Sequence, residues 1–263
     1  MKYNQNQLNE VLKDSRFQNI GTLPSQCKGY DWDTLYIRPF EVTDFKLVSK
    51  AAILGEMSHM VRAVDLAITQ DANDLTIGDF YYVMMWLRIH SLPKTPLIVD
   101  WECGEQVLRH KESNEVIFND ETFKHPENMD DYVLEPCGTQ NTESLHMVNV
   151  EIMSLDENPD NIIIPDGFDF PRARHLEGIT AALKDPETAM LIPSVQWVAG
   201  NTVADKFNSI MGAGAAGMDM LDTGHALNEK YEHGVKEVTT ISCRRCRHQE
   251  QYVINMNPMS FFP

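Results

Sequence analysis

Two cysteines near the end of the sequence constrain the fold of this chain more than any other feature. Cys243 and Cys246 lie between two segments rich in strand-forming residues, 238–241 and 252–254. The pattern predicts a strand, a tight turn and a return strand, which together aim two thiolates at one point, as half of a tetrahedral zinc site requires. Redox-active pairs of this spacing usually open a helix that follows a strand. The strand-like flanks therefore favour a metal site.

A tetrahedral site needs two more ligands, and two other cysteines have a suitable context. Cys103 and Cys137 are each followed by glycine, which lets the backbone turn close to the sulfur. The expected zinc ligands are Cys103, Cys137, Cys243 and Cys246. Four thiolates leave no open coordination position, so the zinc would be structural.

Three other residues bear on this prediction. His110 and His248 are the alternative ligands if one cysteine lies out of range. Cys27 is expected to be a small buried apolar side chain. Because the first residues contain no apolar core of a signal peptide, we expect synthesis in a cytosol, where cysteines are thiols or ligands rather than disulfides.

The charge of the chain argues against two classes of partner. Its 263 residues include 39 acidic and 22 basic ones, a net charge of −17. Nucleic acids and anionic membrane surfaces both require clustered Lys and Arg, so we expect neither as a partner. No run of about 18 apolar residues predicts a membrane span. The local exception is Arg244, Arg245 and Arg247, which we expect to neutralise thiolate charge or to contact an acidic partner.

The order of helical and strand patterns predicts an α+β fold. In it, helical regions flank a small antiparallel strand region that carries a zinc-knuckle-like hairpin. We expect four segments along the chain. They are an N-terminal arm (1–20), a mixed α/β core with a strand-rich centre (21–171), a helical region (172–234) and a C-terminal hairpin and tail (235–263).

Capping and breaking residues locate several helices. Thr76 and the acid three residues later predict the start of a helix over 80–89, which is apolar almost all round and therefore buried. Pro193 is expected to kink or split a helix that begins at Pro186. Further helices are predicted over 203–211 and 218–233, the second ended by Gly234 in a left-handed conformation. Strands are predicted within 34–40, 97–101, 106–108, 115–118, 148–153 and 161–164.

The segment from Gly212 to Gly217 has the glycine spacing of a dinucleotide-binding loop. That function needs a strand before the glycines and a βαβ unit around them, whereas residues 205–211 have a helical pattern. We therefore expect a flexible connection or a close contact between helices. No arrangement of nucleophile, base and acid is recognisable, so no catalytic residue is predicted.

Two adjacent phenylalanines lie in the terminal segment 259–263. Their exposure to water would be costly, so they either pack back on the protein or dock on another subunit. If they dock on another subunit, this segment and the three arginines of the hairpin form one interface, which predicts self-association.

The order of several motifs resembles that of a known family. The motifs are Thr22-Leu-Pro-Ser25 before Tyr30, Leu75-Thr-Ile-Gly-Asp79 entering an aromatic helix with Leu87-Arg88 and Ser91, a cysteine-bearing strand near 103, Phe168-Asp-Phe-Pro-Arg172 leading into helices, and the closing cysteine pair followed by Phe-Phe. In this order they resemble the baseplate hub assembly proteins of T-even-like contractile-tail bacteriophages, over roughly residues 20–263. Members of that family often carry a second cysteine pair in the central strands. Here Cys103 is followed by Gly-Glu-Gln, so that pair is incomplete.

The resemblance implies a structural or assembly role without catalysis. It implies other tail and baseplate proteins as partners, assembly in the host cytoplasm and a place in the virion tail baseplate. Two alternatives stay open at this point. One is a cytosolic zinc-stabilised adaptor unrelated to phages, and the other is an enzyme with a cofactor at Gly212–Gly217 or chemistry at Cys243 and Cys246.

Overall fold

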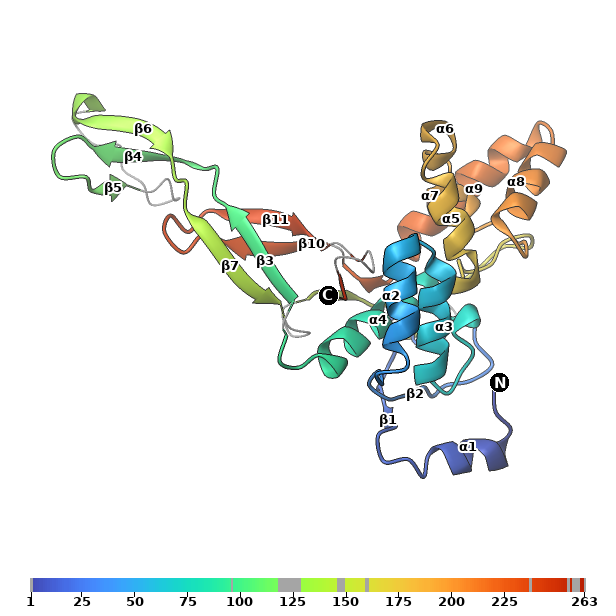
Figure 1. The fold of residues 1–263 in the computed structure, drawn as a ribbon. Coiled ribbons are helices and arrows are strands. Elements are labelled where there is room, and N and C mark those ends of the chain that lie inside the picture. Colours follow the sequence, from blue (N-terminus) through green and yellow to red (C-terminus); the bar gives the residue numbers. More distant parts are fainter. Residues whose placement is uncertain are drawn as a thin grey trace. The chain divides into compact units, whose positions relative to one another are not determined.

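The chain forms two compact units, which Figure 1 shows as helices and antiparallel ribbons. The computed structural model describes residues 2–95, 97–117, 129–145, 150–158, 161–236, 238–254, 256 and 261–262. The helical unit consists of residues 1–93, 151–236 and 255–263, and the strand unit of residues 94–150 and 237–254. Both units combine stretches that are distant in the sequence, whereas the four expected segments follow chain order. The predicted α+β class is confirmed.

The helical unit contains nine α-helices among its described residues, with short strands between them. Its first half comprises α1 (Gln5–Val11), β1 (Gln18–Asn19), β2 (Tyr36–Ile37), α2 (Phe45–Leu54), α3 (Met57–Ala67), the 3₁₀ helix η1 (Ala72–Asp74) and α4 (Ile77–Ser91). Its second half comprises β8 (Ile152–Met153), the 3₁₀ helix η5 (Ala173–His175), α5 (Leu176–Ala182), α6 (Pro186–Ala189), α7 (Ile192–Val195), α8 (Val203–Gly212), α9 (Ala216–Lys230) and β9 (Gly234–Val235).

Helix α4 is the buried helix that the sequence predicts. The hydroxyl of Thr76 accepts a hydrogen bond from the backbone N–H of Asp79 and caps the first turn. Phe80 and Val83 are fully buried. The residues from Met84 to Arg88 are buried as well, which agrees with an apolar pattern all round the helix.

Three of the motifs singled out in the sequence meet at the N-terminus of α4. The buried carboxylate of Asp79 accepts hydrogen bonds from the backbone of Ser25 (2.9 Å) and from the hydroxyl of Tyr30 (2.6 Å). Arg172 donates to the carbonyls of Asp74 (2.7 Å) and Gly29 (2.9 Å). These motifs therefore form one buried framework of the helical unit.

After residue 172, the helices are broken near Pro193 as predicted, but the last helix does not end at Gly234 as predicted. Pro193 lies in the first turn of α7, which is separate from α6, so the split is confirmed. The expectation that Gly234 caps the last helix is wrong, because α9 ends at Lys230. Gly234 has a φ of +116° but lies in β9, where an added Cβ would come within 2.6 Å of the Cα of Gly78. The glycine allows a close approach of two segments rather than a helix end.

Three of the expected strands are shorter or absent. Of residues 34–40, only Tyr36 and Ile37 pair, with β1, and of the described residues in 148–153 only Ile152 and Met153 form a strand, paired with β9. Residues 161–164 form no strand. There the backbone N–H of Ile163 donates instead to the hydroxyl of Tyr231 (2.8 Å).

The two terminal phenylalanines pack back on the helical unit. Phe261 and Phe262 are buried, and the ring of Phe262 lies 5.7 Å from that of Phe40. The guanidinium of Arg88, itself buried, donates to the carbonyl of Phe261 (2.6 Å). The packing alternative is thus confirmed for these two residues, while residues 259, 260 and 263 of the expected docking segment lie outside the described residues.

The strand unit is built on a long antiparallel ribbon and a hairpin. Its elements are β3 (Leu97–Glu102), β4 (Gln106–His110), β5 (Val116–Ile117), the 3₁₀ helix η2 (Met129–Asp131), β6 (Tyr132–Pro136), β7 (Gln140–Leu145), β10 (Val238–Ser242) and β11 (Gln249–Val253). Strands β3 and β4 follow each other along one side of the ribbon, and β6 and β7 along the other. Strand β3 therefore pairs with β7 and β4 with β6, all antiparallel, while β5 pairs with the other edge of β4. Strands β10 and β11 form the predicted hairpin.

Candidate metal centre

The ribbon is interrupted at two cysteines that lie opposite each other. Cys103 follows β3 and Cys137 follows β6. The backbone N–H of Cys103 donates to the carbonyl of Thr139 (3.0 Å), and that of Cys137 donates to the carbonyl of Glu105 (2.7 Å). Gly138 has a φ of +57°, a conformation that glycine adopts without strain. The glycine after Cys137 thus permits the turn that the sequence context suggests.

The other two cysteines lie in the turn of the β10–β11 hairpin. The backbone N–H of Cys243 donates to the carbonyl of His248 (2.8 Å), and that of Arg247 donates back to the carbonyl of Cys243 (2.9 Å). These bonds close a compact turn that contains Cys246, with Arg247 in the left-handed region at a φ of +59°. The predicted knuckle between two strands is therefore present.

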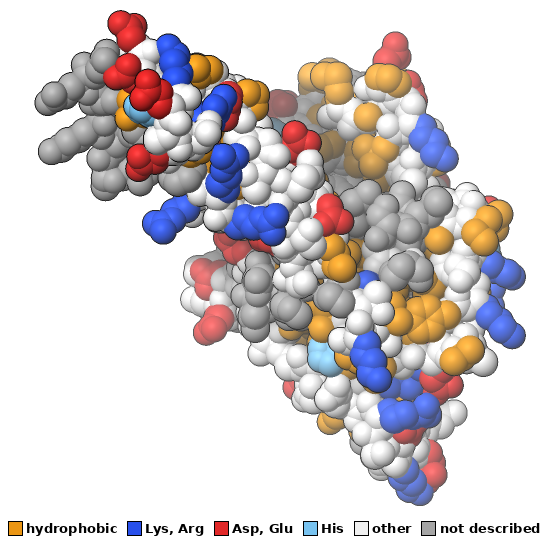
Figure 2. Space-filling model, turned by 60° about the vertical axis from the view of Figure 1, so that its left-hand side comes forward, with side chains coloured by type: hydrophobic (Ala, Val, Ile, Leu, Met, Phe, Trp, Pro, Cys, Tyr) orange, Lys and Arg blue, Asp and Glu red, His pale blue; other side chains and the backbone are white. Residues whose placement is uncertain are grey.

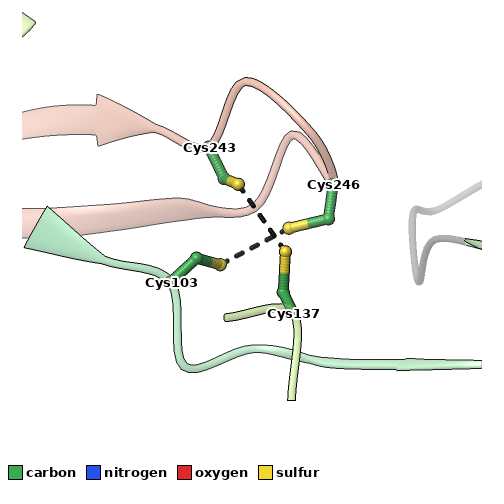
Figure 3. Close-up of side chains that lie close together, drawn as sticks. All are labelled: Cys103, Cys137, Cys243 and Cys246. Carbon is green, nitrogen blue, oxygen red and sulfur yellow. Dashed lines mark hydrogen bonds between the residues drawn. The ribbon is translucent and has the colours of Figure 1, made fainter. Parts of the chain in front are cut away.

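The structure brings all four predicted cysteines together, with their sulfurs pointing toward one another in Figure 3. The Sγ atoms of Cys103 and Cys246 are 3.5 Å apart, those of Cys137 and Cys243 are 3.8 Å apart, and all four lie within 4.8 Å of one another. A zinc ion with Zn–S bonds of about 2.3 Å would place its sulfurs about 3.8 Å apart. A disulfide would need about 2.05 Å. All four residues are buried, so the cluster is able to bind a metal ion.

The pKa values of the thiols differ, because backbone N–H groups stabilise the thiolate of one cysteine in particular. Burial raises the pKa of Cys243, but the backbone N–H groups of Cys246 and Arg245 point toward its sulfur and outweigh that effect, lowering the pKa to about 6. Burial raises the pKa of Cys103 and of Cys246. Four buried thiolates without a cation would repel one another at high cost. A bound cation removes that cost, and metal binding therefore couples to loss of the thiol protons.

A buried amide joins the ribbon to the knuckle. Asn141 on β7 donates to the carbonyl of Thr139 (3.0 Å) and accepts from the backbone N–H of Arg244 (3.0 Å). Nearby, the side chain of Arg245 donates to the carbonyl of Cys137 (3.0 Å). These bonds hold the knuckle over the ribbon. Asn141 was not predicted, because its role depends on the pairing of β7, and a single asparagine in a polar stretch gives no signal of it.

The alternative ligands are engaged elsewhere in the strand unit. Nδ1 of His248 lies 3.0 Å from a carboxylate oxygen of Glu105, and Nδ1 of His110 accepts from the backbone N–H of Ser113 (3.1 Å). Neither imidazole belongs to the cluster of metal-ligand atoms.

Cys27 lies outside the cluster, and the expectation that it is buried is wrong. It is half-buried in a surface turn of the helical unit, has a φ of +58°, and its thiol lies 3.5 Å from the carbonyl of Asp33. The turn keeps the side chain partly exposed, and the pattern of apolar residues in the sequence gives no sign of this turn.

The glycine-rich segment is a turn between two helices. Helix α8 ends at Gly212 and α9 begins at Ala216, and Gly214 between them has a φ of +57°. An added Cβ on Gly217 would lie 2.5 Å from the carbonyl oxygen of Ile210. The predicted helix before the glycines is confirmed, as is a close contact between helices.

Comparisons with known proteins found no match to a family model, a curated protein or a solved structure. Among the described residues, no helix is both long and apolar enough to cross a membrane. The fold and the site define an α+β protein with a buried four-cysteine cluster that can bind a metal.

Proposed function

We propose that the four cysteines hold one structural zinc ion and that the protein acts through contacts with other proteins. The observation that carries the proposal is the buried cluster of four sulfurs from two separate elements. Four thiolates in a tetrahedral arrangement suit zinc or iron. Zinc is the ion we propose, because closed four-cysteine sites are typical of structural zinc. The distances of the cluster are close to the S–S separations of such a site, and the measured metal distinguishes zinc from iron.

The position of the cluster supports a structural role. The closest sulfur pairs each join a ribbon cysteine to a knuckle cysteine, across 143 and 106 residues of sequence. A metal held by these ligands would tie the hairpin to the ribbon. Its four protein ligands would leave no position for a substrate. The ion would therefore determine the shape of the strand unit.

The particular role that we propose is assembly of a contractile phage tail baseplate. Its support is the order of motifs in the sequence, which resembles that of baseplate hub assembly proteins. Three of those motifs pack around Asp79 and Arg172 in the helical unit, as expected of segments that maintain a fold. Other tail and baseplate proteins would be the partners.

The knuckle offers a surface to such partners. Arg244, Arg245 and Arg247 are exposed, in a chain that is acidic overall. Figure 2 shows Lys and Arg side chains spread over the visible face and mixed with Asp and Glu. Guanidinium groups on a rigid turn can pair with carboxylates of a partner or of a second copy.

The test is to isolate the protein in its native complex and to measure both metal content and companions. We expect one zinc per chain by elemental analysis and tail proteins by mass spectrometry. Iron or no metal in the folded protein would refute the zinc site. A complex without tail proteins would refute the baseplate role and leave the zinc site standing.

A further inference from the structure

A cavity of about 740 Å³ lies in the helical unit beneath the N-terminal arm. Two ion pairs hold the part of this arm between residues 2 and 16 at its ends. Lys2 pairs with Asp65 (3.1 Å), and Arg16 pairs with Glu41 (2.5 Å). Between these ties α1 stands away from the other helices in Figure 1. Tyr3 and Leu8 of the arm line the cavity, so the arm forms one of its walls.

Three aromatic side chains outside the arm also line the cavity. Tyr30, Trp32 and Tyr36 all line the cavity. The rings of Tyr30 and Trp32 are stacked, with centroids 4.2 Å apart and planes 9° apart. The guanidinium of Arg172 lies 5.5 Å from the centroid of the Tyr30 ring. Since Tyr30 covers one face of the indole, the cavity reaches the other face or the edge of Trp32.

The charged residues that line the cavity are mainly acidic. Asp31 and Asp33 flank Trp32 in the sequence, are exposed and line the cavity. Lys28 is the one basic residue of the lining. An aromatic ring attracts a cation through its negative face, most strongly in the case of tryptophan. Two carboxylates in the lining of the same cavity add to that attraction and repel anions such as phosphates.

The turn that forms the edge of the cavity is held in an unusual backbone conformation. Gln26 and Cys27 are consecutive residues other than glycine with positive φ, 54° and 58°, and both line the cavity. Such residues persist only where the surrounding structure fixes them, and they concentrate at ligand sites. Hydrogen bonds from Gln26 to the carbonyl of Leu23 (2.9 Å) and from Lys28 to that of Ser25 (2.9 Å) keep the turn in place.

We infer that this cavity binds an organic cation, an alkylammonium or guanidinium group, against the indole of Trp32 and beside Asp31 and Asp33. The group can belong to a Lys or Arg side chain of a partner protein or to a free small molecule. The site lies in the helical unit and does not depend on the proposed zinc ion.

The experiment uses the full-length protein and follows the four indole N–H signals by NMR. Trp86, Trp101 and Trp197 are buried, so Trp32 is the tryptophan that a ligand in the cavity can reach. The probes are tetramethylammonium and its neutral analogue of similar shape, tert-butanol. We expect saturable shifts of the Trp32 signal with the cation alone. Equal shifts with tert-butanol, or none with either probe, would overturn the inference.

Variants separate the aromatic and electrostatic contributions. Trp32→Leu is titrated through neighbouring amide signals, and we expect it to weaken binding about tenfold. The double variant Asp31→Asn with Asp33→Asn should weaken binding severalfold, whereas Asp222→Asn, an exposed position on α9, should not. Unchanged affinity in the double variant, in a protein with an unaltered amide spectrum, would also overturn the inference.

Two peptides of identical sequence identify the source of the cation. One carries a free lysine and the other an acetylated lysine between glycines. Binding of the free-lysine peptide alone supports recognition of a partner's side chain. Binding of tetramethylammonium without either peptide supports a free small cation.

Discussion

Replacing Cys243 with serine should unfold the strand unit and leave the helical unit folded. Serine has nearly the size of cysteine but is a poor zinc ligand, so the substitution tests the metal rather than the packing. Cys243 is the thiol whose pKa is lowered, and it lies 3.8 Å from Cys137 on the ribbon. Loss of this ligand should therefore release the knuckle from the ribbon.

The expected effect is large because the strand unit has a small apolar core. Among its described residues, the buried apolar side chains other than cysteine are Val99, Trp101, Val107, Val150, Ile241 and Ile254. Structural zinc in small domains contributes about 10–16 kcal/mol of apparent binding free energy. A ribbon of two strands, widened to three by the short β5, and a two-stranded hairpin have little independent stability in water. Without the ion, we expect the remaining contacts to be too few to keep the unit folded.

Hydrogen exchange measured by mass spectrometry distinguishes the two units. In Cys243→Ser, amide protection should fall in 97–117, 129–145 and 238–254, and persist in 176–230. A strong chelator should produce the same pattern in the unmodified protein and no further change in the variant. Cys27→Ser is the matched control, because Cys27 lies in the helical unit outside the cluster. Native protection of the strand unit in metal-free protein would refute the reasoning.

Three further predictions concern the helical unit. Phe261→Ala should cost about 3–5 kcal/mol of unfolding free energy, because the ring is fully buried. The control Val42→Ala, at a side chain that is 85% exposed, should cost less than about 0.5 kcal/mol. Equal losses for the two variants in denaturant titrations would contradict the packing of the tail. Gly78→Ala should cost about 1–3 kcal/mol or more, because its Cβ would lie 2.2 Å from the carbonyl oxygen of His233, while Gly212→Ala meets no atom within 4 Å and should melt like the unmodified protein. Burial and the charges of Lys206 and Arg174 lower the pKa of His175 from 6.5 to about 4. The contribution of the neutral imidazole to the unfolding free energy is therefore fully present above pH 6.5 and is lost as the pH falls toward 4. Over that window the unmodified protein should lose up to about 3 kcal/mol more unfolding free energy than His175→Gln, and parallel curves of unfolding free energy against pH would exclude this role.

The metal cluster was predictable because its signals are local. The spacing of Cys243 and Cys246 and their strand flanks indicate a knuckle, and the glycines after Cys103 and Cys137 indicate turns at the other two sulfurs. In the reducing compartment that we expect from the sequence, four such cysteines would be thiols or metal ligands rather than disulfides. None of these steps requires knowledge of which strands pair.

The parts that sequence reasoning missed depend on contacts between distant segments. Strands β6 and β7 have little apolar alternation, and β7 reads Gln-Asn-Thr-Glu-Ser-Leu, so neither was recognised. The role of Asn141 follows from their register. Gly234 looked like a helix end because helix ends favour glycine, yet the structure uses it for a close approach to Gly78. Local patterns give no means of separating these two uses of glycine.

The two units are stabilised by different means, and this bears on the proposed role. The helical unit packs large side chains in several clusters, one of them built around Phe170, Trp197 and Tyr231. It also contains three of the motifs on which the resemblance rests. The strand unit has six buried apolar residues other than its cysteines among those described. Hydrogen bonds join Arg244 and Arg245 of the knuckle to Asn141 and Cys137 of the ribbon, and we expect these bonds to be lost when the knuckle separates from the ribbon. A partner that contacts these arginines would therefore bind the metal-loaded protein and not the metal-free form, whereas a partner of the helical unit would bind both.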